Sequence, residues 1–322
     1  MLKKIGKLVF GGMCVMVASS AFAASWPDRP IRFIVPFPAG GSTDAFVRAL
    51  LPQLRDELGQ TVVVEYKAGA GGAIGADAVA KAAPDGYTIG LGSPGALMVS
   101  PSLTKTPYDT AKDFSYVSGI ARVPAVLVVT QKSDIKTVAQ LVERAKAKPG
   151  SVTYAHAGQG TLVHLVGELF SATAGIKLGP VPYRGAAPAV QGLMSGDTDI
   201  LVADLSSVWT MIKAGQLTAL AITSKDRLPA LPNVPTVAES GYAKATYESE
   251  YGAIAPAGVP PAILAKLKAA MSKTLASEAV RTSYATYGAA TLDTTSAQYR
   301  DAIVSGARQW GAFVKERGIT AE

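Results

Sequence analysis

The residues best suited to chemistry lie near the N-terminus, in the stretch PFPAGGSTD at residues 36–44. Two adjacent glycines let the backbone come close to a bound group, and the three residues after them are types that start helices. An apolar run before the stretch indicates a buried strand. Together these features gather backbone N–H donors at a positive helix end, which predicts a carboxylate or phosphate site. The candidate ligand contacts are Phe37, Ala39, Gly40, Gly41, Ser42, Thr43 and Asp44.

A second stretch repeats this arrangement at residues 157–161, where AGQGT resembles the AGGST of residues 39–43. It follows a predicted strand and precedes an apolar helical pattern. The repeat is short, but the same physics applies to both stretches, so we expect them to contribute to one site. The candidate contacts here are Ala157, Gly158, Gln159, Gly160 and Thr161.

Two charged residues are further candidates, each with two interpretations. Asp204 ends a buried-type strand and opens a helix, so it either contacts the ligand or caps the helix. Arg184 either pairs with a distal carboxylate through its fork of donors or lies solvated beside a glycine turn.

Other side chains near these loops complete the candidate site. His156, just before the second loop, either donates to the ligand or is a neutral histidine satisfied by loop carbonyls. His164 is expected to be structural. Ser93 ends a strand in small residues that suit a pocket, and Tyr183 and Phe37 are candidate aromatic walls. For Trp209 core packing is the expected role.

Several chemistries are excluded by the sequence. It contains no Gly-x-Ser-x-Gly, His-Glu-x-x-His or Walker-type loop. The glycine loop at residues 69–75 lacks the spacing of a dinucleotide fingerprint, and no acidic partner follows it, so we interpret it as a tight turn for close helix packing. We therefore expect no cofactor, no metal and no enzymatic activity. A secreted α/β enzyme remains the weaker alternative.

The first 23 residues have the pattern of a secretory signal peptide: three lysines, an apolar run and Ala21-Phe22-Ala23. Cleavage near Ala23 is expected, which places the protein in the periplasm. Cys14, the one cysteine, lies inside this segment, so the mature chain has no disulfide or thiolate metal site. Without the three lysines of this segment the formal net charge falls from +7 to +4, a mild positive balance that suits an anionic ligand, while the scattered basic residues do not indicate nucleic acid binding.

The elements that must position these residues alternate between strand and helix along most of the chain. Strands are expected at residues 31–37, 61–66 and 87–93, each followed by a helix or a glycine loop and helix. This order predicts a parallel sheet covered by helices, with the ligand at the carboxyl ends of the strands. A second set of such units follows residue 150, and helices at 261–276 and 296–316 finish the chain.

The simplest topology is two α/β domains with the second inserted into the first. A long apolar strand at 117–130, interrupted by Pro124, is expected to pass from one domain to the other, and a return strand at 247–255 leads back. The predicted first domain comprises residues 24–123 and 246–322, and the second comprises residues 124–245. Such a two-strand hinge leaves a ligand cleft between the domains.

Six motifs follow one another along essentially the whole mature chain. They are PFPAGGSTD at 36–44, EYKAGAGG at 65–72, AAPDGYT at 82–88, AGQGT at 157–161, VPYRG at 181–185 and LPNVPTVAESG at 231–241. With these motifs in this order, the sequence resembles a known family, the Bug-type solute-binding proteins. These proteins are the periplasmic receptors of tripartite tricarboxylate transporters. The resemblance implies a type II periplasmic-binding-protein fold that closes on a small carboxylate.

The resemblance also implies how the site works. In the family, loops that match residues 37–44 and 157–161 hold the ligand's proximal carboxylate through backbone amides, hydroxyls and waters. Amino-acid-binding relatives use an aspartate at the position of Asp204, and relatives with other ligands keep it too. Specificity for the rest of the ligand varies, so a mono-, di- or tricarboxylate, an amino acid or an aromatic acid all remain open. We expect a monomer that meets its membrane transporter transiently; a ligand-sensing partner of a membrane kinase is the alternative.

Overall fold

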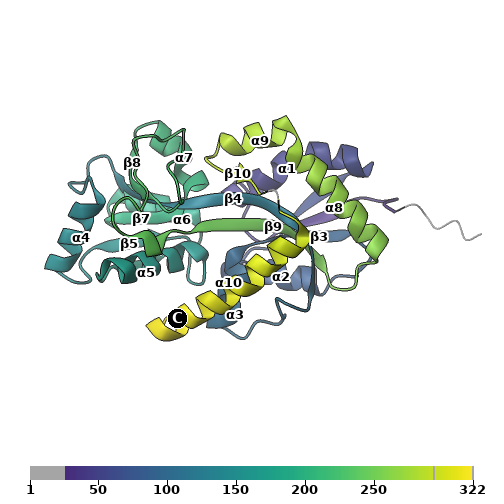
Figure 1. Cartoon of the computed structure of the whole chain (residues 1–322), viewed down its shortest axis with the longest axis horizontal. Helices are drawn as coiled ribbons and strands as arrows, with labels where there is room; N and C mark the ends of the chain where they lie inside the picture. The colour runs from purple at the N-terminus through teal and green to yellow at the C-terminus, as the bar shows by residue number, and fades with distance from the viewer. Residues whose placement is uncertain (1–25, 293, 321–322) are drawn as a thin grey trace, which may run out of the picture.

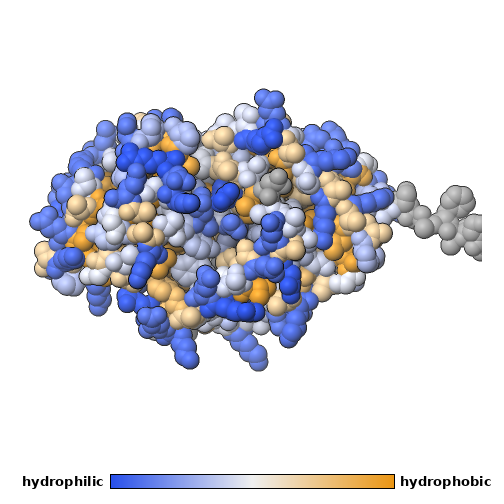
Figure 2. Space-filling view, viewed as in Figure 1, coloured by the Kyte–Doolittle hydropathy of each residue, from blue (hydrophilic) through white to orange (hydrophobic). Residues whose placement is uncertain are grey.

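The computed structural model describes residues 26–292 and 294–320. The predicted signal peptide and its cleavage site lie outside this part of the chain. The described residues form two lobes side by side, and two long strands run through both of them (Figure 1). No helix in the described part is both long enough and apolar enough to cross a membrane. Hydrophilic side chains are spread over the face seen in Figure 2, with small hydrophobic patches between them.

The first lobe is built on three parallel strands, as the sequence predicts. Their order in the sheet is β2-β1-β3, and β9 and β4 follow as antiparallel neighbours. The strands are β1 (Ile31–Val35), β2 (Val62–Tyr66), β3 (Thr88–Gly92), β4 (Phe114–Thr130), β9 (Glu248–Pro256) and the short β10 (Ala290–Thr291). The helices are α1 (Ser42–Leu58), α2 (Ala73–Ala80), α3 (Ser100–Leu103), α8 (Pro261–Ala276), α9 (Glu278–Ala285) and α10 (Ser296–Arg317).

The second lobe repeats the strand and helix alternation on the other half of β4. Its sheet continues from β4 through β7 and β5 to β6, and β8 also pairs with β4. The strands are β5 (Thr153–His156), β6 (Gly179–Pro182), β7 (Ile200–Asp204) and β8 (Leu217–Ile222). The helices are α4 (Val138–Ala147), α5 (Leu162–Ala174), α6 (Ala186–Ser195) and α7 (Leu205–Lys213).

β4 is the strand that joins the two lobes. It pairs with β9 as far as Pro124, and with β7 from Ala125 onward. The partner of β4 therefore changes at the proline that interrupts the apolar run. Together β4 and β9 form the expected two-strand connection between the lobes. The domain boundaries at residues 123/124 and 245/246 remain a prediction, which this change of pairing supports.

The hydrophobic core consists of two layers, one on each face of the sheet. Val126 and Val128 of β4 belong to one buried cluster and Leu127 to the other, as the alternation of a strand requires. Helices α1, α6, α7, α8 and α9 pack into the first cluster, and helices α2, α4, α5 and α10 into the second. This sandwich explains why β4 is apolar along nearly its whole length.

Some short elements were not predicted. The segment after β2 forms a 3-10 turn, η1 (Ala70–Gly72), before α2. A π-helical turn, η2 (Gly95–Val99), leads from β3 into α3, and a 3-10 turn, η3 (Ala243–Ala245), precedes β9. Helix α9 and strand β10 were also missed. Such elements are too short to produce a periodic pattern in the sequence.

Candidate functional site

A cavity of about 360 Å³ lies between the lobes, at the carboxyl ends of β1, β3, β5 and β7. This is where loops of a parallel sheet are expected to converge. Many of the residues proposed from the sequence line it. They are Phe37, Ala39, Gly40, Gly41, Ser42, Thr43, Ser93, Ala157, Thr161, Arg184 and Asp204. The other proposed contacts, which are Asp44, His156, Gly158, Gln159, Gly160 and Tyr183, do not line the cavity.

The first loop reaches the cavity through the N-terminus of α1. The N-cap residue is Gly41, and no side chain caps the helix. The prediction that a residue from Ser42 to Asp44 would be the cap was therefore wrong, because the helix begins one residue earlier than the hydroxyl pattern indicated. As a result the first-turn amides are not taken up by a cap. Across the cleft, the Ser42 hydroxyl lies 3.4 Å from the hydroxyl of Ser207.

Asp44 lies behind this loop, buried and turned away from the cavity. Its Oδ2 accepts a hydrogen bond from the backbone N–H of Gly40 at 2.8 Å. Its Oδ1 accepts from Arg48 Nε at 2.8 Å and from the Tyr66 hydroxyl at 2.7 Å. Burial alone would raise the pKa of this carboxyl, but the three donors hold it below its ordinary value. Asp44 thus fixes the loop that carries the cavity-lining glycines.

The second loop reaches the cavity through the N-terminus of α5. Thr161 is the N-cap residue, as predicted, but its hydroxyl donates to the Gly158 carbonyl at 2.6 Å instead of capping the helix. Ala157 and Thr161 line the cavity, together with Leu162 and Val163 of the first helical turn. Sequence reasoning missed these last two residues, because their apolar side chains indicated only core packing.

The two histidines stack on each other behind the second loop. Their ring centroids are 4.5 Å apart, and both side chains are buried. His156 Nδ1 lies 3.1 Å from the Gly158 carbonyl, in agreement with the interpretation of a neutral histidine satisfied by the loop. Burial and then the neighbouring ring lower the pKa of His156 to about 3, and burial lowers the pKa of His164 to about 4. Both rings are therefore neutral at neutral pH.

Asp204 lies on the cavity wall and is held by β9, one of the two strands that connect the lobes. Its Oδ1 accepts from the Ser249 hydroxyl at 2.9 Å, and its Oδ2 accepts from the Tyr251 hydroxyl at 2.5 Å. Asp204 is the N-cap residue of α7, but its side chain makes no capping bond, so the capping interpretation of its carboxylate was wrong. Burial raises the pKa of Asp204, while the two hydroxyl donors oppose the rise.

Tyr251 also lines the cavity and was not predicted. It lies in the middle of β9, and the alternation of a strand does not tell which face meets a ligand. Its partner Asp204 is the last residue of β7, and only the folded sheet brings these two residues together. No signal in the sequence pointed to this residue.

Arg184 enters the cavity wall at the start of α6. Its side chain is exposed, and no hydrogen bond or ion pair to another described residue is found for it. Ala186, Ala187 and Pro188 of the first turn of α6 line the cavity beside it. Tyr183 does not reach the cavity, since its hydroxyl packs against Gly192.

The arrangement suits an anion. The first turns of four helices, α1, α5, α6 and α7, line the cavity, and none of their N-caps has a side-chain capping bond. Unpaired first-turn N–H groups and the positive end of the helix dipole favour a negative ligand. No group of three or more His, Cys, Asp or Glu side chains in the described part of the chain has the arrangement of a metal site.

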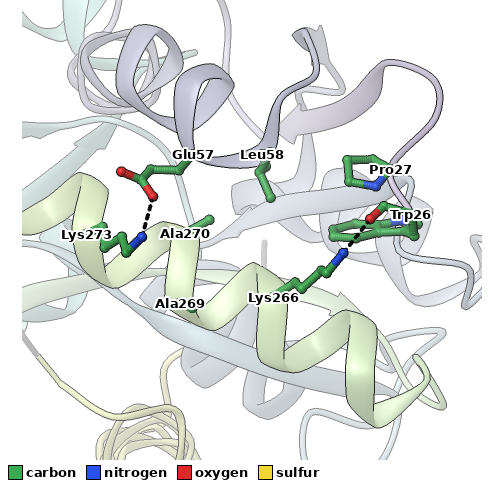
Figure 3. A pocket seen from close by; sticks show the side chains of 8 residues that line it. All are labelled: Trp26, Pro27, Glu57, Leu58, Lys266, Ala269, Ala270 and Lys273. Atoms are coloured by element: carbon green, nitrogen blue, oxygen red, sulfur yellow. Dashed lines mark hydrogen bonds and ion pairs between the residues drawn. The ribbon is translucent and has the colours of Figure 1, made fainter.

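A second cavity of about 360 Å³ lies in the first lobe, away from the cleft (Figure 3). The lysines on its α8 wall are already engaged. Lys266 Nζ donates to the Trp26 carbonyl at 3.0 Å, and Lys273 Nζ pairs with Glu57 at 3.0 Å. These contacts tie the start of the described chain and α1 to α8, so we assign this cavity a structural role.

Two lobes connected by two strands, with a cavity between them, define the periplasmic-binding-protein class of folds, of type II as expected. The model of one family, described as tripartite tricarboxylate transporter family receptor, matches residues 46–319. The chain is also 40% identical over 304 residues to the protein BugT of Bordetella pertussis (strain Tohama I), covering 94% of this chain and 93% of BugT. The chain therefore belongs to the tripartite tricarboxylate transporter receptor family, and the resemblance to Bug-type proteins is confirmed.

Solved structures agree with this assignment. The periplasmic binding protein BugD is 33% identical with a TM-score of 0.85, over 92% of this chain and 99% of BugD. Rpa4515 of R. palustris, solved with adipate, is 32% identical with a TM-score of 0.86, over 92% of this chain and 99% of that chain. Carboxylate binding is a property of the family, in agreement with the adipate of Rpa4515.

Proposed function

We propose that this protein is a periplasmic receptor, without enzymatic activity or cofactor, that captures a small carboxylate by closure of its two lobes. As a monomer it then delivers the ligand to a tripartite tricarboxylate-type membrane transporter. The observation that carries the proposal is the cavity between the lobes, into which the uncapped first turns of four helices open. The related Rpa4515 was solved with the dicarboxylate adipate.

Backbone donors suffice for useful affinity. A hydrogen bond to a charged group contributes about 1.5 to 3 kcal/mol, and micromolar binding requires about 8 kcal/mol. Amides from α1 and α5 together with the hydroxyls of Ser42 and Thr43 can supply several such bonds to one carboxylate. In this proposal Arg184 and Asp204 act on the distal part of the ligand and set which carboxylate is preferred.

The test is a ligand panel measured by thermal unfolding and calorimetry. Each carboxylic acid is paired with its primary amide, which has the same shape without the charge. Acids that bind should raise the unfolding temperature by several degrees at 100 times their Kd, because this occupancy stabilises the fold by about 2.7 kcal/mol. The amides should leave it unchanged. Absence of a shift and of binding heat across aliphatic, aromatic and amino acids would contradict the proposal.

The variants Asp204→Asn and Arg184→Gln separate the two distal roles. Loss of binding only for ligands that carry an ammonium group, when Asp204 is changed, assigns Asp204 as a ligand contact. Loss only for ligands with a second carboxylate, when Arg184 is changed, assigns Arg184. If a variant has the same binding profile as the wild type, the residue it changes has a structural role and does not contact the ligand.

A further inference from the structure

The glycine-rich segment after β2 has no part in the cavity, yet its backbone is unusual. Four consecutive residues, 69–72, have positive φ: 135° at Gly69, 47° at Ala70, 63° at Gly71 and 99° at Gly72. Ala70 is the one residue other than glycine with positive φ in the described part of the chain. At Ala70 such a backbone costs free energy, and strain of this kind tends to persist where function requires it. Close packing inside the first lobe accounts for Gly75, where a Cβ would lie 2.6 Å from Pro36 Cβ, and for Gly72, where it would lie 3.0 Å from Ser93 Oγ, but it does not account for Gly71.

Gly71 of this segment touches the second ligand loop, which belongs to the other lobe. A Cβ added at Gly71 would lie 3.1 Å from the carbonyl oxygen of Gly160. Gly95, at the edge of the cavity, completes the contact, because a Cβ there would lie 2.9 Å from the Gly71 oxygen and 3.4 Å from the Gly160 oxygen. Three backbone segments thus meet with no side chain between them. We call Gly71, Gly95 and Gly160 the glycine seam.

The second ligand loop is therefore two-sided. Ala157 and Thr161 line the cavity, while Gln159 and Gly160 between them contact the first lobe. The Gln159 amide donates to the carbonyl of Thr320, just beyond α10, at 2.8 Å. A Cβ on Gly160 would lie 3.4 Å from Cδ1 of Leu103 in α3. These two loop residues, expected from the sequence to touch the ligand, instead join the lobes.

We propose that the segment Gly69–Gly72 is the closure element of the cleft, and that Gly71 controls ligand affinity through the glycine seam without touching the ligand. This inference rests on the closure mechanism of the proposed function. Because packed contacts between lobes do not deform continuously, a side chain at position 71 holds the lobes apart and lowers the closed fraction. Apparent affinity falls in proportion to that fraction.

The test compares Gly71→Asn with Gly59→Asn. Asparagine tolerates the left-handed backbone, so the added side chain is probed without a large backbone cost. Gly59 is a matched control in the same lobe, with φ of 69° and no atom within 4 Å of an added Cβ. The probe is the acid of the panel that raises the unfolding temperature of the wild type most. We expect Gly71→Asn to bind this acid at least tenfold more weakly than Gly59→Asn, while the two variants have the same unfolding temperature in the absence of ligand. Equal affinities for the two variants would overturn the proposal.

Amide hydrogen exchange decides the inference separately from the proposed function. If the wild type binds no carboxylate at all, the receptor proposal fails, while the seam is still tested in the free protein. Exchange at residues 157–161 that is faster in Gly71→Asn than in Gly59→Asn would then support the closure contact. Equal exchange rates would refute it.

Discussion

Asp44 supports the ligand loop from behind through three hydrogen bonds. Its carboxylate accepts from the Gly40 amide on one oxygen and from Arg48 and Tyr66 on the other. Only an ionised carboxylate accepts on both sides at once. The residue type at position 44 therefore matters for the geometry of the Gly40–Gly41 turn, although Asp44 lies outside the cavity.

The variant Asp44→Asn tests this role. Its amide presents a donor on one side, so either the Gly40 N–H or the pair of Arg48 and Tyr66 loses its acceptor. We expect unfolding free energy to fall by about 1 to 3 kcal/mol and carboxylate affinity to fall with it. Urea unfolding and calorimetry measure the two effects.

The control for this prediction is Asp56→Asn on the same helix. Asp56 pairs with Arg55 at an exposed site, and exposed pairs contribute about 0 to 1 kcal/mol. Equal losses for the two variants would show that Asp44 has no special role in the loop.

The types of the residues at the loop tips were predictable, but their orientation was not. A strand, glycines and a hydroxyl in sequence identified Ser42 and Thr161 as residues at helix starts beside a cavity. Whether Asp44 or Gln159 points to a ligand depends on what lies behind each loop. Tyr66 and Thr320, which are far away in the sequence, supply those partners.

At the scale of elements, β9 couples the cavity wall to the connection between the lobes. Ser249 and Tyr251 both donate to Asp204, and the Tyr251 ring packs on Phe46 of α1 with centroids 5.9 Å apart. A change at Asp204 therefore alters the hydrogen bonds of β9, a strand that spans both lobes. The effect of the Tyr251 hydrogen bond on unfolding free energy should therefore depend on pH.

The variant Tyr251→Phe should destabilise the protein more at pH 7 than at pH 4. Burial already raises the pKa of Asp204 above its unfolded value. The protonated carboxyl therefore contributes stability at low pH, and this contribution is lost as pH rises from about 4 through the folded pKa. Removing the Tyr251 donor raises that pKa further. We expect a cost of about 1 kcal/mol at pH 4 that grows to about 1.5 to 3 kcal/mol at pH 7, measured by urea unfolding.

Tyr284→Phe is the matched control for this variant. The Tyr284 hydroxyl is buried and donates to the neutral carbonyl of Phe46 at 3.1 Å. Its loss should cost about 1 kcal/mol at every pH. Parallel pH profiles for the two variants would mean that Asp204 has the same charge state across this range with and without the Tyr251 bond.

Long elements were predicted well because their pattern repeats over several turns. The expected bounds of α8, residues 261–276, agree with the structure, since Pro261 starts the helix. Segment 69–72 shows the limit of this reasoning. Its glycines indicated a tight turn, but the other lobe, which explains their backbone, enters only in the folded molecule.

At the scale of the whole molecule, a ten-stranded sheet passes through both lobes, and the two core layers continue across the connection. The order of strands and helices predicted two α/β lobes. The strand expected at 117–130 to pass from one lobe to the other is β4, which pairs with β9 as far as Pro124 and with β7 beyond it. Both lobes therefore share buried surface, and we expect groups buried in either lobe to affect the stability of the whole.

The stacked histidines His156 and His164 should make the fold sensitive to acid. Both have pKa values below that of an unfolded histidine, about 3 for His156 and about 4 for His164. Such groups contribute stability that is present above the unfolded pKa of about 6.5 and is lost as pH falls toward the folded values. Each should reduce unfolding free energy by up to about 1.4 kcal/mol per pH unit over this range. The variant His164→Gln removes one of the two terms.

The measurement is the difference in unfolding free energy between wild type and His164→Gln, from urea titrations between pH 8 and pH 4.5. Taking the difference cancels the carboxyls common to both proteins, including Asp204, whose raised pKa acts in the opposite direction. The difference should be constant above pH 7 and shift in favour of the variant below about 6.5. Ser171→Ala, a change on the same helix that removes a buried hydroxyl but no titratable group, should keep the wild-type slope. A pH-independent difference for His164→Gln would mean that the folded protein accommodates a protonated histidine in this stack.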